Sequence, residues 1–323
     1  MGVRWIGIAE ESTYGTAVTS PDHSMRYLEL DLSPDQQRII EFESAYREKE
    51  QSLLGPFIGS GRLTAYARPD DIGYFLKWLT GSVTSAQVGS SSVYTHTFTL
   101  ADSVKSFTLT DNRGISGSSG SRACVGCAMK SLTLEAPARG ALTFEANIQY
   151  QWEELITEPT MGTLSSLRPF MFYDGSITYG GSSLARVEAI RFTWENGMPD
   201  DTHCIGSRKL PGIDLEGVEV SFEVDMKLTD WSIRKYFYGA SNATEPQDEE
   251  TTYALNVTFT GQPTGESESG AEYYKIELNF PKVVLTENPA SVSRRDRMTQ
   301  RATFVALRDS NNYIKLWNKE TSY

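Results

Sequence analysis

The sequence predicts a mainly β protein, with a β-sandwich or barrel-like fold built from two related units in tandem and one short helix in each unit. Three observations predict this fold: the composition, an alternation of apolar and polar residues, and an internal repeat. Hydrophobic residues make up 39% of the chain and charged residues 22%, which are values of a folded globular protein. Aromatic residues (11%) and abundant Thr, Ser and Val favour strands over helices.

Alternating side chains mark the expected strands, because a strand with one buried face carries apolar and polar residues in turn. The alternation runs through Arg26–Leu32 and Gly61–Ala67, and it is clearest at Val218–Val224. The charged stretch Ser33–Gln51 lies between the first two strands. It is either a short helix or a long projecting hairpin or loop, and the polar, turn-rich stretch Asn196–Pro211 is its counterpart in the second half.

An internal repeat indicates two units. Residues Leu53–Ser82 resemble Lys209–Ser241, and the match places Gly61 on Gly217. Each copy contains a glycine, a strand pattern, a helical turn and a second glycine. Two copies are too few for a solenoid, so a duplicated domain is the better interpretation. Two later strand pairs are also matched between the halves: Val93–Leu100 and Ser106–Thr110 with Tyr253–Thr260 and Tyr273–Phe280.

One short helix follows the strand in each copy. In the first copy, Asp70 and Asp71 stand at the expected start, Phe75 and Trp78 lie on one face, and Gly81 ends the helix. Glycine often follows a helix because it adopts the left-handed conformation without a steric cost. The second copy repeats the arrangement with Thr229 or Asp230, Ile233, Tyr236, Phe237 and Gly239.

The repeat divides the chain into an N-terminal arm and two units. Residues 1–25 are rich in Gly, Thr and Ser and lack a clear period, so we expect an arm and not a core element. The first unit is predicted at residues 26–160 and the second at 161–323. A polar break at Glu153–Pro169 separates them.

The charge and cysteine content exclude several classes of protein. The formal net charge of −12 argues against tight nucleic-acid binding, which requires Lys and Arg side chains to displace counterions from phosphates. Three cysteines are too few for a disulfide framework. No apolar run approaches the length of a membrane span, and the first residues lack a secretory core, so we expect synthesis and folding in a cytoplasm.

The residues that most resemble a chemical site are two cysteines. Cys124 and Cys127 form a CxxC motif, and His203 with Cys204 would complete a set of zinc ligand types. One CxxC motif is a weak signal, and reduced, partly buried thiols are the simpler interpretation. The three histidines stand in no recognisable arrangement with a nucleophile or carboxylate. We therefore expect no catalytic residue, no metal and no cofactor.

Two charged segments are the better functional candidates, because they carry both signs and could meet complementary charges on another subunit. The alternative is an ordinary solvated surface. The candidate contact residues are Arg38, Glu41, Arg47, Glu48 and Lys49 in the first segment, and Arg294, Arg295, Asp296 and Arg297 in the second.

Three stretches resemble the tail tube proteins of long-tailed bacteriophages. The opening Gly7–Val18 (GIAEESTYGTAV) is similar to the N-terminal segment of that family. The stretches Pro169–Gly181 (PFMFYDGSITYGG) and Val187–Met198 (VEAIRFTWENGM) are similar to the second half of such proteins. The resemblance lies in pattern and order, and it extends over nearly the whole chain.

The resemblance implies a packed two-sheet fold with a flanking helix, in which one sheet curves around a channel and a long loop reaches the next ring. Single-unit members form hexameric rings, so a chain with two units is expected to form a trimeric ring with pseudo-sixfold symmetry. Such rings stack into a hollow tube in the virion tail, assembled in the host cytoplasm beside other tail proteins. DNA passes through the lumen without specific binding. We expect an acidic lumen, because it would repel DNA phosphates.

A second hypothesis comes from a different class of protein. A β-rich module that binds carbohydrate or a receptor, or a baseplate component, is also compatible with the sequence. The 16 tyrosines and 6 tryptophans could stack on sugar rings. An enzyme ranks third.

Overall fold

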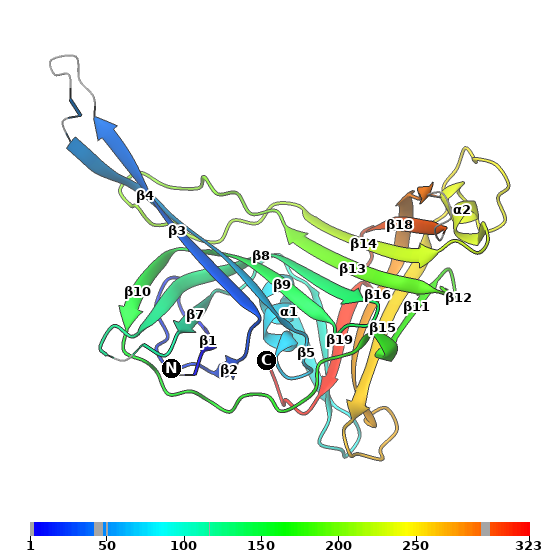
Figure 1. Ribbon diagram of the computed structural model, residues 1–323, viewed down its shortest axis with the longest axis horizontal. Helices are drawn as coiled ribbons and strands as arrows, with labels where there is room; N and C mark the ends of the chain where they lie inside the picture. The colour runs from blue at the N-terminus through cyan, green and yellow to red at the C-terminus, as the bar shows by residue number, and fades with distance from the viewer. Residues whose placement is uncertain (1–2, 42–47, 50, 116, 292–297) are drawn as a thin grey trace.

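The chain is mainly β, as predicted (Figure 1). The computed structural model describes residues 3–41, 48–49, 51–115, 117–291 and 298–323. Within these residues, all strands belong to one hydrogen-bonded network that does not close on itself. Two short α-helices, α1 (Ile72–Thr80) and α2 (Ser232–Phe237), lie against it.

The strands divide between the two halves of the chain. The first half contains β1 (Trp5–Glu10), β2 (His23–Met25), β3 (Glu29–Glu41), β4 (Gln51–Tyr66), β5 (Gly81–Gln87), β6 (Tyr94–Leu100), β7 (Phe107–Asn112), β8 (Ser121–Pro137), β9 (Thr143–Tyr150) and β10 (Trp152–Ile156). The second half contains β11 (Gly175–Tyr179), β12 (Ser182–Ser183), β13 (Val187–Asn196), β14 (Val218–Lys227), β15 (Tyr253–Pro263), β16 (Tyr273–Glu287), β17 (Ala290–Ser291), β18 (Thr299–Ala306) and β19 (Tyr313–Asn318).

One layer of the fold is an antiparallel sheet in the order β3-β4-β9-β8-β13-β14-β18-β16, which we call the long sheet. It consists of two sets of four strands. β3-β4-β9-β8 come from the first half, and β13-β14-β18-β16 come from the second. The pairing of β8 with β13 joins the two sets.

The other layer has the same arrangement behind each set of four strands. In the first half it runs β2-β1-β7-β8-β10, and in the second β12-β11-β15-β16-β19. β8 and β16 therefore take part in both layers. Each has a bulge where it enters the long sheet, between Met129 and Ser131 in β8 and between Leu285 and Glu287 in β16. Such a bulge bends a strand, which lets it pass from one layer to the other.

The two halves thus share one pattern of strand pairing, although a common origin and the boundaries 26–160 and 161–323 remain predictions. The pairing corrects two details of the match made from sequence. β7, and not β6, has the neighbours that β15 has, while β6 pairs with β5 and with β19 of the other half. Gly61 of β4 lies opposite Ile148 of β9. The residue that corresponds to Ile148 in the second half is Phe304 of β18, and Phe222 of β14 lies opposite it. The structural equivalent of Gly61 is therefore Phe222 and not Gly217.

The expectation of an N-terminal arm was wrong, because β1 is a core strand. It lies between β2 and β7, and Ile6 and Ile8 are fully buried. Glu11, directly after β1, fixes the next turn: its buried carboxylate accepts hydrogen bonds from two backbone N–H groups and two hydroxyls. The donors and their distances are Gly15 N (2.9 Å), Gly126 N (2.8 Å), Ser106 Oγ (2.7 Å) and Thr108 Oγ1 (2.8 Å). The segment between β1 and β2 is irregular, and its residues 12–22 are exposed or half-buried.

The charged stretch after the first strand pattern is part of a long hairpin. β3 and β4 pair from Glu29 with Thr64 out to Glu41 with Gln51, and the hairpin projects away from the body (Figure 1). Of the two alternatives at Ser33–Gln51, the hairpin is the one observed over the described residues. Its counterpart, residues 197–217, is an irregular segment between β13 and β14.

The helix of the first half forms as predicted and fills the space between the layers. Seven of the nine residues of α1 are buried. Trp78 stacks on Phe107 with ring centroids 4.0 Å apart, and Phe75 packs on Phe144 at 5.0 Å. Gly81 ends the helix with φ +84°, in the left-handed region that glycine adopts without strain.

The acidic residues at the start of α1 do not act as caps. Asp71 stands at the N-cap position, but its carboxylate accepts no bond from the helix and lies 2.8 Å from His23 Nε2. Asp70 accepts a hydrogen bond of 2.6 Å from Ser165 Oγ. These contacts tie β2 and the connection between the halves to the helix. In α2, Trp231 stands at the N-cap position, and Asp230 before it accepts a hydrogen bond of 2.8 Å from the backbone N–H of Ser232.

Replacing Glu11 tests how far its hydrogen bonds stabilise the fold. We expect Glu11→Ala to lower the free energy of unfolding by about 3 kcal/mol, because buried donors lose a charged acceptor. Urea unfolding followed by tryptophan fluorescence measures the change. Glu154→Ala, at an exposed position of β10, is the matched control and should change the value by less than about 0.5 kcal/mol. An equal effect of the two substitutions would contradict the assignment.

Candidate functional site

The candidate site is one face of the long sheet. Successive side chains of a strand point to opposite faces. One face is packed into the core, with residues such as Leu63, Phe144 and Phe222 fully buried. The other face is exposed or half-buried and almost entirely polar, and we call it the polar face. Its charged residues are Glu29, Asp31, Asp35, Arg62, Glu135, Glu145, Arg191, Glu195, Glu219, Glu223, Asp225, Lys227, Glu287 and Arg301.

The cations of the polar face bridge carboxylates on neighbouring strands. Arg62 lies 3.0 Å from Glu29 and 3.7 Å from Glu145, measured between side-chain nitrogen and oxygen atoms. Arg191 lies 3.1 Å from Glu135, across the joint between β8 and β13. Cross-strand ion pairs of this kind support the register of a sheet, although each contributes little when exposed.

A second cluster of the same kind lies on β14 and β18. Arg301 bonds to Asp225 with its Nε 2.7 Å from Oδ1, and it lies 3.8 Å from Glu223. The hydrogen bond to Asp225 raises the pKa of the Arg301 guanidinium. The arrangement at the end of the sheet in the second half thus resembles that around Arg62 in the first.

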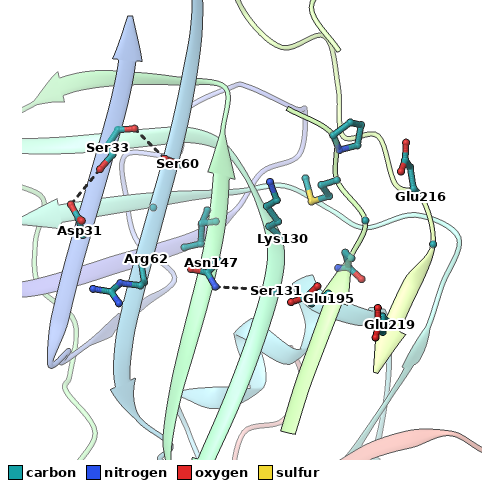
Figure 2. Close-up of a pocket in the computed structure, with 17 residues that line it drawn as sticks. Asp31, Ser33, Ser60, Arg62, Lys130, Ser131, Asn147, Glu195, Glu216 and Glu219 are labelled. Carbon is teal, nitrogen blue, oxygen red and sulfur yellow. Dashed lines mark hydrogen bonds between the residues drawn. The ribbon is translucent and has the colours of Figure 1, made fainter. Parts of the chain in front are cut away.

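The polar face is acidic. Its residues include ten carboxylates and four cations, which gives a net charge of −6. Near the centre it is hollowed into a cavity of about 710 Å³ between β3 and β14 (Figure 2). Asp31, Glu195 and Glu219 line this cavity, and within the described residues no cation lies within ion-pair distance of any of the three. Arg62 and Lys130 also line the cavity, and they pair with Glu29, Glu145 and Asp200.

Two edges of the long sheet are open in the single chain. Over the described residues, β3 pairs with β4 on one side and with no strand on the other. At the opposite end, residues 284–287 of β16 and the short strand β17 pair with β18 alone. Open edges carry unpaired backbone N–H and C=O groups, which invite another strand.

The hairpin β3–β4 exposes apolar side chains on both of its faces. Ile39 lies opposite Leu53, and Arg38 lies opposite Leu54. Residues that lie opposite each other in an antiparallel pair share a face, so Ile39 and Leu53 point to one side and Ile40 and Leu54 to the other. All four are exposed. A projecting element with two apolar faces is a candidate for contacts with other molecules.

Some of the contact residues proposed from sequence lie on this hairpin. Arg38, Glu48 and Lys49 are exposed, and Glu41 is the last residue of β3. Arg47 lies outside the described residues, and so do Arg294, Arg295, Asp296 and Arg297. For these residues the contact role remains a prediction.

The cysteines are not gathered into one site. Cys124 and Cys127 are buried in β8, whereas Cys204 is exposed in the segment between β13 and β14. His203 Nε2 lies 3.1 Å from the carbonyl oxygen of Phe57. In the described part of the chain, no group of three or more His, Cys, Asp or Glu side chains is arranged to hold a metal ion. Across the same residues, no helix combines the length and apolarity needed to cross a membrane.

Comparison with known protein families adds to this geometry. A family model described as phage tail tube protein matches residues 6–306. The chain belongs to the phage tail tube protein family. No curated protein matches it. The tail tube family is a family of structural proteins of the phage tail, which agrees with the resemblance found in the sequence.

The polar face of this tail tube protein was only partly visible in the sequence. The alternation at Val218–Val224 correctly placed Glu219, Ser221 and Glu223 on one side of a strand. Alternation within a strand does not reveal which strands lie next to each other. The neighbourhood of Glu195 and Glu219 with Asp31 therefore depends on the pairing of β8 with β13, which the sequence did not indicate.

Thiol reactivity tests the burial of the CxxC motif. Burial raises the pKa of the Cys124 thiol to about 12 and also raises that of Cys127. Because the thiolate is the reactive form, we expect one thiol per folded chain, that of Cys204, to react with Ellman's reagent at pH 8. All three should react in denaturant. Cys204→Ser serves as the control and should leave no fast-reacting thiol, whereas rapid reaction of two or three thiols in the folded protein would contradict the burial.

Proposed function

We propose that this protein is a two-unit tail tube subunit, three copies of which close into a ring that stacks into a hollow tube for DNA. One observation carries the proposal: the long sheet repeats the same four-strand order twice and ends in two open edges. The β8–β13 pairing joins the two repeats inside the chain. The same kind of joint, between residues 284–291 of one copy and β3 of the next, would continue the sheet from chain to chain.

Closure of this sheet would satisfy both open edges. A head-to-tail interface generates a ring when its rotation closes, and stacking of identical rings generates a filament. Each chain supplies two four-strand sets. The six units that the family resemblance implies would therefore come from three chains, with pseudo-sixfold symmetry.

The polar face would then line the lumen. It is the face of the long sheet that is not packed into the core, and its acidic character suits a channel for DNA. Carboxylates repel phosphates, and the four cations are engaged with neighbouring carboxylates. Asp31, Glu195 and Glu219 would form acidic bands around the middle of the channel, so that DNA slides through without specific binding.

The charged segments would set the position of one ring on the next. Arg38, Glu41, Glu48 and Lys49, together with Arg47 and Arg294–Arg297, would meet complementary charges on the next subunit or the next ring. We place assembly in the host cytoplasm and the finished tube in the virion tail. The protein would act there as a structural component, with no catalytic role.

Electron microscopy of the purified protein tests the proposal directly. We expect rings or hollow filaments, and class averages of the rings should show threefold symmetry with six similar lobes. The reason is that two open sheet edges favour polymerisation until the sheet closes. Discrete, non-polymerising particles at all concentrations would contradict the proposal and would favour a binding module or a baseplate component.

DNA retention tests the assignment of the polar face to the lumen. We expect the triple variant Asp31→Lys, Glu195→Lys, Glu219→Lys to assemble and to retain short double-stranded DNA, with binding that weakens steeply as salt increases. Unmodified tubes should not retain it. A matched control places three lysines at exposed positions away from this face: Glu154→Lys, Glu249→Lys and Glu268→Lys. Equal DNA retention by the two variants would show that the polar face does not line the lumen.

A further inference from the structure

We propose that the β3–β4 hairpin of one copy lies in a groove on the second half of the neighbouring copy in the same ring. The groove has a volume of about 780 Å³ and lies between the loop after β6 and the ends of β14 and β18. The inference rests on the proposed ring and names the contact that would accompany each sheet joint. It commits to one occupant, a second copy of this chain.

The chain already contains one contact of this kind, between its two halves. The segment 197–217 leaves the long sheet between β13 and β14 and crosses β8, β9 and β4 of the first half near Lys130, Gln149 and Phe57 (Figure 1). Asp200 accepts bonds from Lys130 Nζ (3.0 Å) and from Gln149 Nε2 (3.1 Å). The Leu210 carbonyl accepts a bond of 2.8 Å from Gln151 Nε2.

The far end of this segment is fixed on β4. The backbone N–H of Phe57 donates to the Arg208 carbonyl over 2.9 Å, and Arg208 Nε donates to the Gly55 carbonyl over 2.7 Å. Lys209 Nζ lies 4.7 Å from the ring centroid of Trp152. The Phe57 side chain is only 5% exposed, and its ring centroid lies 4.8 Å from that of Trp152. The joint between β8 and β13 is thus accompanied by a loop that seals the strand ends beside it.

The corresponding strand ends of the second half are uncovered. When the two halves are matched by the bulges of β8 and β16, Gln151 after β9 corresponds to Leu307 after β18. When β4 is matched to β14 by their pairing with β9 and β18, Phe57 corresponds to Val218. Val218 and Leu307 line the groove and are 37% and 41% exposed. Leu100, at the opposite wall, is also exposed. The surface that is buried beside the internal joint is therefore open beside the free edge, where it exposes these apolar side chains among polar ones.

The hairpin is the element that would cover this surface. β3–β4 occupies in the first half the place that β13–β14 occupies in the second, and residues 37–56 match residues 197–217 closely in number. Over the described residues β3 and β4 stay paired out to Glu41 and Gln51, whereas 197–217 is irregular. When β3 of the next copy pairs along residues 284–291, its hairpin would cross the ends of β16, β18 and β14. Ile39 and Ile40 would then stand where Pro199 and Asp200 stand in the internal contact.

The side chains at the proposed hairpin contact are apolar where those at the internal contact are polar. Gln149, which bonds to Asp200 in the internal contact, corresponds to Val305 in the second half. A polar pair in the internal contact would thus be replaced by an apolar pair, Ile40 with Val305. The hairpin exposes apolar residues on both faces, so the groove would cover one face and leave the other for the adjacent ring.

A cysteine cross-link between hairpin and groove tests the inference. In the internal contact Gln151 bonds to Leu210. Counted back from Phe57 and Val218, Lys49 corresponds to Leu210, and Leu307 corresponds to Gln151. The variant Lys49→Cys, Leu307→Cys, Cys204→Ser therefore places two thiols at the predicted contact. Assembled tubes are treated with a short bis-maleimide and separated on a denaturing gel. We expect dimers and trimers and no larger species, because a contact within one ring closes after the last subunit of that ring.

The remaining outcomes are distinct. A ladder that continues beyond the trimer would show that the hairpin contacts another ring, and it would overturn the inference. So would the absence of cross-linking in tubes that are intact by electron microscopy. The variant Lys49→Cys, Tyr273→Cys, Cys204→Ser, with its second thiol outside the groove, is the control and should remain monomeric on the gel. A protein that never forms rings would overturn the proposed function itself, and this inference with it.

Discussion

The antiparallel pairing of β8 with β13 is the constraint on which the rest of the structure depends. It joins two four-strand sets of identical order into one sheet, from Ser131 opposite Glu195 to Pro137 opposite Ala189. Without it, each half would expose a further open edge and the two polar strips would not form one face. Arg191 and Glu135 bridge this joint on the polar side, while Phe192 and Leu134 meet on the core side.

The bulges in β8 and β16 explain how a small protein can build both layers around each half. Because each strand bends at its bulge, its first part belongs to the outer layer and its last part to the long sheet. The layers are therefore connected through the backbone as well as through the packing of α1 on β8. The family match over residues 6–306 is consistent with a framework that extends from β1 to β18.

Local sequence predicted what depends on neighbouring residues and missed what depends on distant ones. The fold class, α1 with its terminal Gly81, and the strand at Val218–Val224 followed from periodicity and turn chemistry. The core position of β1 did not, because Glu11 is satisfied by groups up to 115 residues away, which no local pattern displays. Strand neighbours, and with them the acidic cavity at Asp31 and Glu195, were equally hidden.

The internal joint also changes the order of events in assembly. In the proposed ring of six units, three joints form while each chain folds, at a rate that does not depend on protein concentration. The other three require encounters between chains. Covalent linkage gives the internal partners a high effective concentration, so a two-unit chain reaches a closed ring from three bodies where a one-unit chain would need six. In that ring the β8–β13 pairing would be an assembly step completed in advance, and ring nucleation should depend on a lower power of subunit concentration.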